Sequence, residues 1–547
     1  DKAPLPGLDE RQLYVSLFAL ALSAWCAGLL VLRRDGVLGR KLVTVTLCVA
    51  TVSALVAWTN FGQVHGLWVD KPGVVAGDPH RAKTEIRRPF HAYEYYHYYL
   101  GAKYFRELGY EGLYDCTALA DGEIAVEDGY PARITGWVRD LDDVLRDKRY
   151  IDARRHCTDD VKPHFSAGRW ASFKYDIRQL RTLVGEGFWP EVVGDAGFNP
   201  PPSWCVFGSA VANLLPVKVG EFPMYLVASG IDMVLLVICF VALFRAFGLP
   251  AAAMFGVFVG ASLIAAYGWN GGAFLRYTWL TTLIVGLCFL QRGKWALAGA
   301  FLAASACDRV FPAAFAVGAL VPVAYRALHS AHDRRRLVRF GVSFGATTAV
   351  LCLLGLAVFG FDAWRVFFLR IVRHGDVYYG MHIGLKKVIT WRDWTPRVNF
   401  AGHAGLGVFH DWNLRLRETW RSMWWLTIPL QAAAFLGAAY AGVRRRPYES
   451  ALLMGIVGMF FFNLPANYYY IVIALVPSML LVAAMRGRTS AMRGRELAVL
   501  GAFYVFWVAT LLFPRSMRNV LILNHAICST LLAFLAVWIV AWTSKRA

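Results

Sequence analysis

The sequence predicts an all-α polytopic membrane protein with roughly 13 transmembrane helices and a large extracytoplasmic first loop of mixed or helical structure. Of the 547 residues, 57% are hydrophobic and 17% are charged, whereas soluble domains carry about 25% charged residues. Apolar runs recur along the chain, and several exceed the roughly 18 residues that indicate a membrane span. Short arginine-rich loops separate many of these runs.

The apolar runs divide the chain into five parts. Residues 1–59 hold two expected spans, and residues 60–221 form a long polar segment with helices beside the membrane. Residues 222–360 hold six expected spans, residues 361–422 form a second polar segment, and residues 423–547 hold the last five spans. The expected spans are 12–32, 42–59, 222–244, 251–267, 277–290, 295–307, 310–327, 340–360, 423–442, 450–462, 468–485, 497–513 and 519–542.

The basic loops orient these spans. Counted in order, six segments fall on one side: "RRDGVLGRK", "QRGK", "HSAHDRRRLVR", "VRRRPYE", "RGRTSAMRGRE" and the tail "TSKRA". Because Lys and Arg are retained on the cytoplasmic side, we expect the N-terminus and both polar segments to lie outside. The run at 201–217, "PPSWCVFGSAVANLLPV", is too short to span comfortably, so we expect a re-entrant or interfacial element there.

The basic loops between the expected spans account for much of the net charge of +20. A basic balance can indicate nucleic-acid binding, but here the basic residues lie between spans, and we expect no nucleic-acid partner. The Ala, Gly and Arg content favours a bacterial inner membrane, with the functional site facing the periplasm or exterior. Cys116 and Cys157 lie in the first polar segment, where an oxidising compartment would permit a disulfide, although the sequence leaves the pairing open.

The segment "HAYEYYHYYLGAKYFRELG" places one acid among many aromatic residues. We expect a helix from about His91 to Leu108, ended by Gly109. At helical spacing His91, Glu94 and His97 share an arc of about 120°. Three readings stay open at this point: Glu94 is a catalytic base, the three side chains bind a metal, or Glu94 is a surface carboxylate paired with a nearby Lys or Arg. Asp78, in "AGDPHR", is the second candidate acid.

Basic side chains gather at the outer ends of the expected spans. Arg276 precedes one span, and Asp308 and Arg309 follow another. Charged residues at membrane depth are candidates for function, although Asp308 and Arg309 could equally form a local ion pair that seats a helix end. The second polar segment adds Arg373, His374 and Lys386 in an aromatic, amphipathic setting that suits the membrane surface and an anionic headgroup or phosphate.

This layout resembles the GT-C superfamily of integral membrane glycosyltransferases, which use polyprenyl-phosphate-linked sugars. The match to its mannosyltransferase-like branch is carried by Glu94, Tyr98, Gly109 and Tyr114, followed by "FNPPPSWCVFGSAVANLLP". The acid is Glu where that family usually has Asp, and no Asp-x-Asp follows the second apolar run, so the need for a divalent metal stays open.

The resemblance implies an inverting transfer of a sugar to a glycan, lipid or protein acceptor, with membrane lipids as surroundings. Glu94 would be the base that removes the acceptor proton, with Asp78 as the second choice. Side chains that bind the donor and stabilise its departing phosphate would complete the site. The candidates for this binding role are His91, His97, Arg276, Asp308, Arg309, Arg373, His374 and Lys386.

Two other classes of function remain open at the level of sequence. A transporter or flippase for a lipid-linked or anionic substrate would place charges at the bilayer midplane, whereas the charges here cluster at outer ends. A membrane acyl or phosphoryl transferase would use His91 or His97 as its base, and loss of a histidine would then be more harmful than loss of Glu94.

Overall fold

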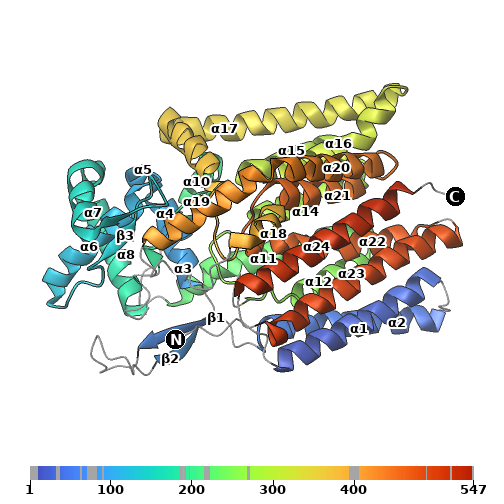
Figure 1. The fold of residues 1–547 in the computed structure, drawn as a ribbon, viewed down its shortest axis with the longest axis horizontal. Helices are drawn as coiled ribbons and strands as arrows, with labels where there is room; N and C mark the ends of the chain where they lie inside the picture. The colour runs from blue at the N-terminus through green and yellow to red at the C-terminus, as the bar shows by residue number, and fades with distance from the viewer. Residues whose placement is uncertain are drawn as a thin grey trace.

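The computed structural model describes residues 10–32, 37–61, 65–70, 83–88, 91–183, 189, 192–195, 197–214, 222–267, 271–393, 406–487, 489–517 and 520–544. Within these residues the chain is predominantly helical (Figure 1). The strands described there form two separate antiparallel pairs, β1 (His65–Asp70) with β2 (Lys83–Arg88) and β3 (Trp137–Arg139) with β4 (Asp147–Arg149). The expected all-α membrane class is therefore confirmed.

The first polar segment folds into a helical body, here called the polar domain (residues 91–214 as far as described), at one end of a helix bundle (Figure 1). Its helices are α3 (Ala92–Glu94), η1 (Tyr95–Leu100), α4 (Gly101–Lys103), α5 (Phe105–Leu108), α6 (Gly112–Asp128), α7 (Tyr150–His156), η2 (Cys157–Val161), η3 (Lys162–His164), α8 (Ala167–Leu183) and α10 (Pro202–Leu214).

The bundle consists of roughly parallel and antiparallel helices that run along the long axis of the molecule (Figure 1). They are α1 (Glu10–Leu32), α2 (Val37–Trp58), α11 (Phe222–Phe247), α12 (Leu249–Gly260), α14 (Thr278–Gln291), α15 (Trp295–Asp308), α16 (Ala313–Ala327), α17 (Ala331–His374), α20 (Trp424–Val443), α21 (Pro447–Val457), η5 (Gly458–Phe462), η6 (Asn467–Ala474), α22 (Leu475–Met485), α23 (Ser490–Ser516) and α24 (Val520–Thr543). Short elements α18 (Leu385–Ile389) and η4 (Thr390–Asp393), with α19 (Leu406–Ser422), connect α17 to α20.

Among the described residues, eight helices are long and apolar enough to cross a membrane. Five shorter apolar helices, of 10–17 residues, occupy other expected spans: 249–260, 278–291, 295–308, 313–327 and 447–462. Eight of the 13 expected crossings therefore correspond to helices of full length, and the count of 13 is not confirmed. The run expected over 251–267 forms a helix only as far as Gly260, because the chain turns at Ala261.

The basic loops meet at one end of the bundle, here called the basic end. Arg292 donates to the Arg245 carbonyl over 2.7 Å, and Arg486 donates to the Tyr448 hydroxyl over 2.7 Å. Arg445, in the loop after α20, and Glu496, in the first part of α23, form a buried ion pair of 2.6 Å. The last helix, α24, ends here, and the polar domain lies at the other end, here called the outer end (Figure 1).

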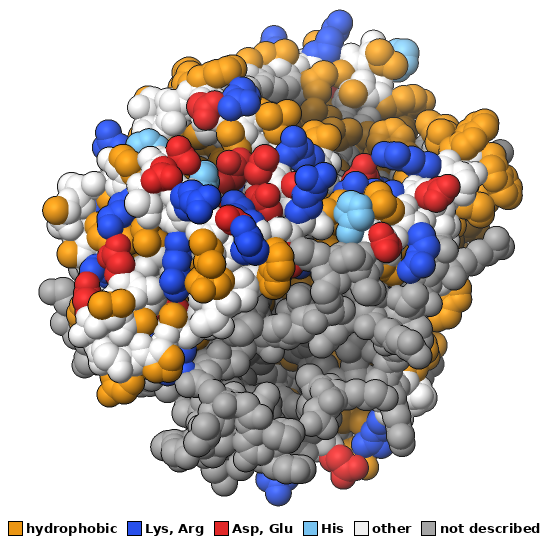
Figure 2. All heavy atoms as spheres, turned by 60° about the vertical axis from the view of Figure 1, so that its left-hand side comes forward, with side chains coloured by type: hydrophobic (Ala, Val, Ile, Leu, Met, Phe, Trp, Pro, Cys, Tyr) orange, Lys and Arg blue, Asp and Glu red, His pale blue; other side chains and the backbone are white. Residues whose placement is uncertain are grey.

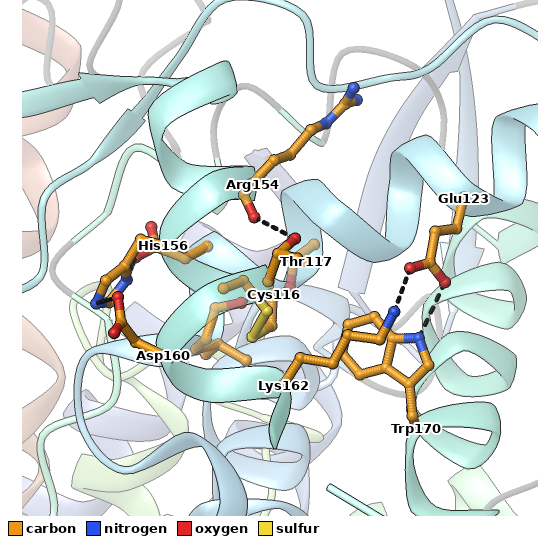
Figure 3. Close-up of a disulfide and its surroundings, with 12 residues drawn as sticks. Cys116, Thr117, Glu123, Arg154, His156, Asp160, Lys162 and Trp170 are labelled. Carbon is orange, nitrogen blue, oxygen red and sulfur yellow. Dashed lines mark hydrogen bonds and ion pairs between the residues drawn. A yellow bond between two sulfur atoms is a disulfide. The ribbon is translucent and has the colours of Figure 1, made fainter. Parts of the chain in front are cut away.

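A disulfide braces the polar domain. Cys116 of α6 is bonded to Cys157 at the start of η2 (Figure 3), as the sequence allowed. Nearby, Glu123 accepts hydrogen bonds from the Lys162 ammonium over 2.8 Å and the Trp170 indole N–H over 2.9 Å (Figure 3). The helices α6, η2 and α8 are therefore joined by covalent and polar contacts around a largely aromatic core.

Helix α17 links the bundle to the polar domain. The Ser330 side chain caps its start by accepting from the Asp333 N–H over 3.3 Å. Its 44 residues correspond to about 66 Å, roughly twice the hydrocarbon thickness of a bilayer. The helix bends at Gly360, whose φ of 79° is non-helical. Beyond the bend, buried Arg370 donates to the Tyr110 carbonyl and, over 3.3 Å, to the Asn199 side chain, so this end is anchored in the polar domain.

The segment expected to be re-entrant or interfacial forms α10. It packs against α17 and α4, and its Ser203 hydroxyl donates to the Cys307 carbonyl at the end of α15 over 2.6 Å. Phe207 and Leu214 remain exposed. This short helix therefore lies between the polar domain and the outer end of the bundle.

Candidate functional site

The aromatic segment after residue 90 forms the expected helical stretch, with two irregularities: a π-helical turn and a non-helical residue at Tyr104. The elements α3, η1, α4 and α5 follow one another from Ala92 to Leu108, and η1 is a π-helical turn. The His91 ring accepts from the Glu94 N–H over 3.4 Å and caps the start. A π turn changes the angular spacing of side chains and is frequent at functional sites. The periodicity assumed from the sequence therefore does not hold through η1.

The side chains considered as a triad, His91, Glu94 and His97, have different surroundings. His97 is buried in the polar domain, where its ring contacts the Tyr93 carbonyl at 2.9 Å and the Tyr114 hydroxyl at 2.8 Å. Glu94 instead pairs with Arg276, which lies outside the polar domain. Across the described residues, no group of three His, Cys, Asp or Glu side chains could hold a metal ion. The arrangement of His91, Glu94 and His97 as a metal-binding triad is thus not formed.

Glu94 and Arg276 form an ion pair where the polar domain meets the outer end of the bundle. The Glu94 side chain is 16% exposed and the Arg276 side chain is 7% exposed. The Arg276 guanidinium lies 4.7 Å from the centre of the Tyr468 ring, within the range of a cation–π interaction. The expectation that Glu94 pairs with a Lys or Arg is confirmed, since its partner is Arg276. The expectation that it lies on the surface is wrong, because the pair is largely buried.

The backbone around Arg276 is held in an unusual shape by Asp232. This carboxylate, fully buried in α11, accepts from the N–H groups of Arg276 and Tyr277, each over 3.2 Å. Leu275, just before them, has a φ of 54°, a left-handed conformation that is unfavourable for a branched side chain. The His91 N–H donates to the Gly272 carbonyl of the same turn over 2.9 Å. These contacts fix Arg276 relative to the helix that carries Glu94.

A second arginine lies close to the same group of aromatic rings. Arg309, at the end of α15, pairs with Asp308 over 3.0 Å and donates through Nε to the Tyr469 hydroxyl over 3.0 Å. The Asp308 carboxylate also accepts from the Thr278 hydroxyl, at the start of α14. The local ion pair considered for Asp308 and Arg309 is present. It orients Arg309 toward tyrosines and does not exclude further contacts, because a guanidinium has five N–H donors.

Tyrosines connect the two arginines. Tyr98, one turn after Glu94, lies 5.6 Å from the Arg309 guanidinium, measured to the ring centre. Tyr468 and Tyr469 are adjacent, and their ring centres are 4.5 Å apart. Burial raises the pKa of Tyr98 above its ordinary value, so its hydroxyl stays neutral and can donate a hydrogen bond. Glu94, Arg276 and Arg309 are therefore brought together by Tyr98, Tyr468 and Tyr469, here called the outer cluster.

Sequence reasoning missed Tyr468 and Tyr469. Both lie in "NYYYIVIA", at the start of an expected span, where aromatic residues are common because they favour the membrane interface. The signal that could have marked them is the run of three tyrosines directly after "NLPAN", since Pro and Asn interrupt an apolar stretch at that point. These tyrosines lie close to Arg276 and Arg309 only because of long-range packing, which a local sequence pattern does not reveal.

The other candidate residues are held elsewhere. Arg373 is exposed and donates to Asp142 of the polar domain, over 2.9 Å to its carbonyl. Lys386 lies 3.3 Å from the Asp376 carboxylate. Asp78 and the His374 side chain lie outside the part of the chain that is described. On the face shown in Figure 2, acidic and basic side chains intermingle over the polar domain, as expected for locally compensated charges.

The outer cluster combines a carboxylate with two guanidinium groups and neutral hydroxyls. A carboxylate can accept a proton from a hydroxyl group, and guanidinium groups match the geometry of phosphate oxygens. Arg276 lies two residues before α14 and Arg309 directly follows α15, while the loop joining these helices belongs to the basic end. The cluster therefore lies at the outer end. Comparison with family models, with curated proteins and with solved structures gave no match to this chain.

Proposed function

We propose that the protein is a membrane glycosyltransferase that moves a sugar from a polyprenyl-phosphate-linked donor to an acceptor on the extracytoplasmic face. The observation that carries this proposal is the outer cluster, in which Glu94, Arg276 and Arg309 lie together at the end opposite the basic loops. Arginine-rich loops are typical of the cytoplasmic side, and the Cys116–Cys157 disulfide suits an oxidising compartment. Both features favour an outward-facing cluster.

In the proposed topology the five shorter apolar helices complete the crossings. They run alongside the eight longer helices (Figure 1). A chain that crosses 13 times places its N-terminus and the polar domain on one side and the basic loops on the other, in agreement with the separation of the two ends. The bacterial inner membrane remains the expected location on composition.

The proposed reaction is a single displacement at the anomeric carbon. Glu94 accepts the proton of the acceptor hydroxyl, whose oxygen forms the new glycosidic bond with inversion. The bond from the anomeric carbon to the phosphate oxygen breaks, and its electron pair leaves with the polyprenyl phosphate. Arg276 and Arg309 stabilise the negative charge that grows on this phosphate. Tyr98 and Tyr469 supply hydroxyl groups beside it.

The structure supports Glu94 rather than a histidine as the base in this proposal. His97 is buried and directed at Tyr114, and the His91 ring is engaged with the Glu94 N–H. A base has to reach the proton that it removes. Glu94 is more exposed than His97 and stands next to the arginines that would bind phosphate.

The test is sugar transfer by the purified protein from a panel of radiolabelled polyprenyl-phosphate sugars, with membrane extract as the source of acceptor. We expect the wild-type protein to transfer one of these sugars and Glu94→Gln to bind the donor without transfer. Undiminished transfer by Glu94→Gln would move the base to Asp78 or a histidine. Saturable donor binding with no transfer under any condition would favour the transporter class instead.

A further inference from the structure

A groove lies between α11 and α14 near the basic end of the bundle. Its cavity volume is about 200 Å³. It is lined by eight residues: Ile238, Val241, Ala242 and Arg245 of α11, Val285, Cys288 and Phe289 of α14, and Arg292, which directly follows α14. In both helices the lining residues follow the spacing i, i+3, i+4 and i+7, so each helix contributes one continuous stripe.

The groove opens toward the surface that would contact lipid. On α11, Val234, Val237, Val241 and Phe244 are exposed apolar side chains, which in a membrane helix face hydrocarbon rather than water. The lining stripe covers seven residue steps, or about 10 Å along the helix axis. This length lies within one leaflet, whose hydrocarbon depth is about 15 Å. An apolar chain could therefore occupy the groove without leaving the membrane.

Two arginines close the groove at the basic end. Arg245 and Arg292 are both exposed, and Arg292 donates through Nη2 to the Arg245 carbonyl over 2.7 Å. This contact fixes the Arg292 side chain against the backbone of Arg245, so two cationic residues flank one mouth of an otherwise apolar groove. The arrangement is complementary to a molecule that has an anionic group at one end of an apolar chain. A phosphodiester fits both guanidinium groups, because each offers paired N–H donors to phosphate oxygens.

We propose that the groove between α11 and α14 binds an anionic phospholipid, with one acyl chain against the apolar stripe and the phosphate at Arg245 and Arg292. This site is distinct from the outer cluster. Helix α14 begins two residues after Arg276 and has 14 residues, so its two ends are about 20 Å apart. The binding of this lipid does not depend on the reaction proposed above.

The test is lipid binding to the purified full-length protein in detergent, measured by native mass spectrometry. The first two probes are phosphatidylglycerol and phosphatidylcholine with identical acyl chains. The third is water-soluble glycerol phosphate, which is added as a competitor. We expect phosphatidylglycerol to bind at least about tenfold more tightly than phosphatidylcholine, because two cations face the headgroup. We expect glycerol phosphate not to compete, because it has no acyl chain. Equal binding of the two lipids, or effective competition by glycerol phosphate, would overturn the proposal.

Two pairs of variants locate the lipid. Val241→Trp fills the groove and leaves both arginines in place, whereas Val237→Trp adds the same ring to the lipid-facing surface of α11 outside the groove. Arg245→Gln with Arg292→Gln removes both charges, whereas Arg334→Ala with Arg335→Ala removes two exposed charges of the same end. Only the first member of each pair should weaken phosphatidylglycerol binding, by about tenfold or more. If Val241→Trp binds like Val237→Trp, the acyl chain does not lie in the groove and the proposal fails.

Discussion

The two ends of the bundle each contain a buried ion pair beside an aromatic ring, yet the surroundings of the pairs differ. At the basic end Arg445 pairs with Glu496, both side chains are 4% exposed, and the guanidinium lies 3.9 Å from the Trp542 ring centre. The second Glu496 oxygen accepts from the Trp542 indole N–H over 2.9 Å. This carboxylate is thus held on both oxygens by the bundle, which is typical of a structural pair.

At the outer end the pair of Glu94 and Arg276 has a different environment. The Glu94 side chain is 16% exposed, and its neighbours include the half-buried hydroxyl-bearing rings of Tyr98, Tyr468 and Tyr469. A second arginine, Arg309, approaches the same rings. A buried ion pair is therefore weak evidence of function by itself, since structural pairs also exist. The partial exposure, the second cation and the tyrosines distinguish the outer pair.

Neutralising Glu94 and Glu496 in separate variants tests the difference between the two ion pairs most directly. Glu94→Gln should lower sugar transfer by roughly 10²–10⁴-fold, the usual contribution of a catalytic base, with donor binding retained. Glu496→Gln should lower the melting temperature and leave the transfer rate per folded molecule unchanged. Rates measured on protein quantified by its folded fraction check both results. If the two variants lost activity in parallel with stability, the outer pair would be structural as well.

Removing the disulfide tests which end faces an oxidising compartment. Cys116 and Cys157 are separated by 41 residues, and closing a loop of this length stabilises a folded chain by about 4 kcal/mol in the chain-entropy description. Cys116→Ser with Cys157→Ser should destabilise the polar domain by an amount of this order. Limited proteolysis over a denaturant series would show the polar domain opening before the basic end. Free thiols at both positions in protein from native membranes would contradict the proposed orientation.

Exchanging arginine for lysine separates phosphate binding from packing. Arg309→Lys keeps the charge but loses the planar fork, so donor affinity should fall by roughly 10-fold to 100-fold. Arg445→Lys is the matched change at the basic end, and it should leave donor affinity unchanged. Equilibrium binding of a radiolabelled polyprenyl-phosphate sugar gives both values. Equal affinities for the two variants would remove Arg309 from the donor site.

The smallest expected effect concerns pH and the polar domain. A hydrogen bond to Asp115, over 2.5 Å, raises the pKa of His156 above its ordinary value of 6.5. The stability from this pair is fully present below that ordinary value and is lost as the pH rises through the raised pKa. The melting temperature of the polar domain should therefore fall modestly as the pH rises above about 6.5. His156→Gln should flatten this slope, and an unchanged slope would show that Lys148 or Asp160, the other charges near the ring, determine it.

Local patterns predicted the elements better than their contacts. The apolar runs, the basic loops and the helix from His91 to Leu108 follow from composition and periodicity, which act over a few residues. The π turn at Tyr95–Leu100 was not predicted, because π and α turns use the same residue types. As a result, His97 was grouped with Glu94 although its ring faces Tyr114.

The outer cluster itself could be predicted only in part. Glu94, Arg276 and Arg309 were singled out because acids and arginines at outer helix ends are uncommon and costly to bury. Their meeting point depends on the turn at Leu275 and on the buried Asp232. The Asp232 carboxylate accepts hydrogen bonds from two backbone N–H groups of that turn. Such long-range hydrogen bonds leave no periodic trace in the sequence.

The bend of α17 at Gly360 has a consequence for how the protein responds to its bilayer. The first part of this helix must match the hydrocarbon thickness, while the last part is fixed to the polar domain through Arg370. Spanning helices adjust to thicker or thinner bilayers by tilting. We expect the non-helical backbone at Gly360 to absorb such a change in tilt, so that the outer cluster does not move. Gly360→Ala, strained at a φ of 79°, should therefore make transfer sensitive to the chain length of the surrounding lipid, whereas the wild-type protein should work across bilayers of graded thickness.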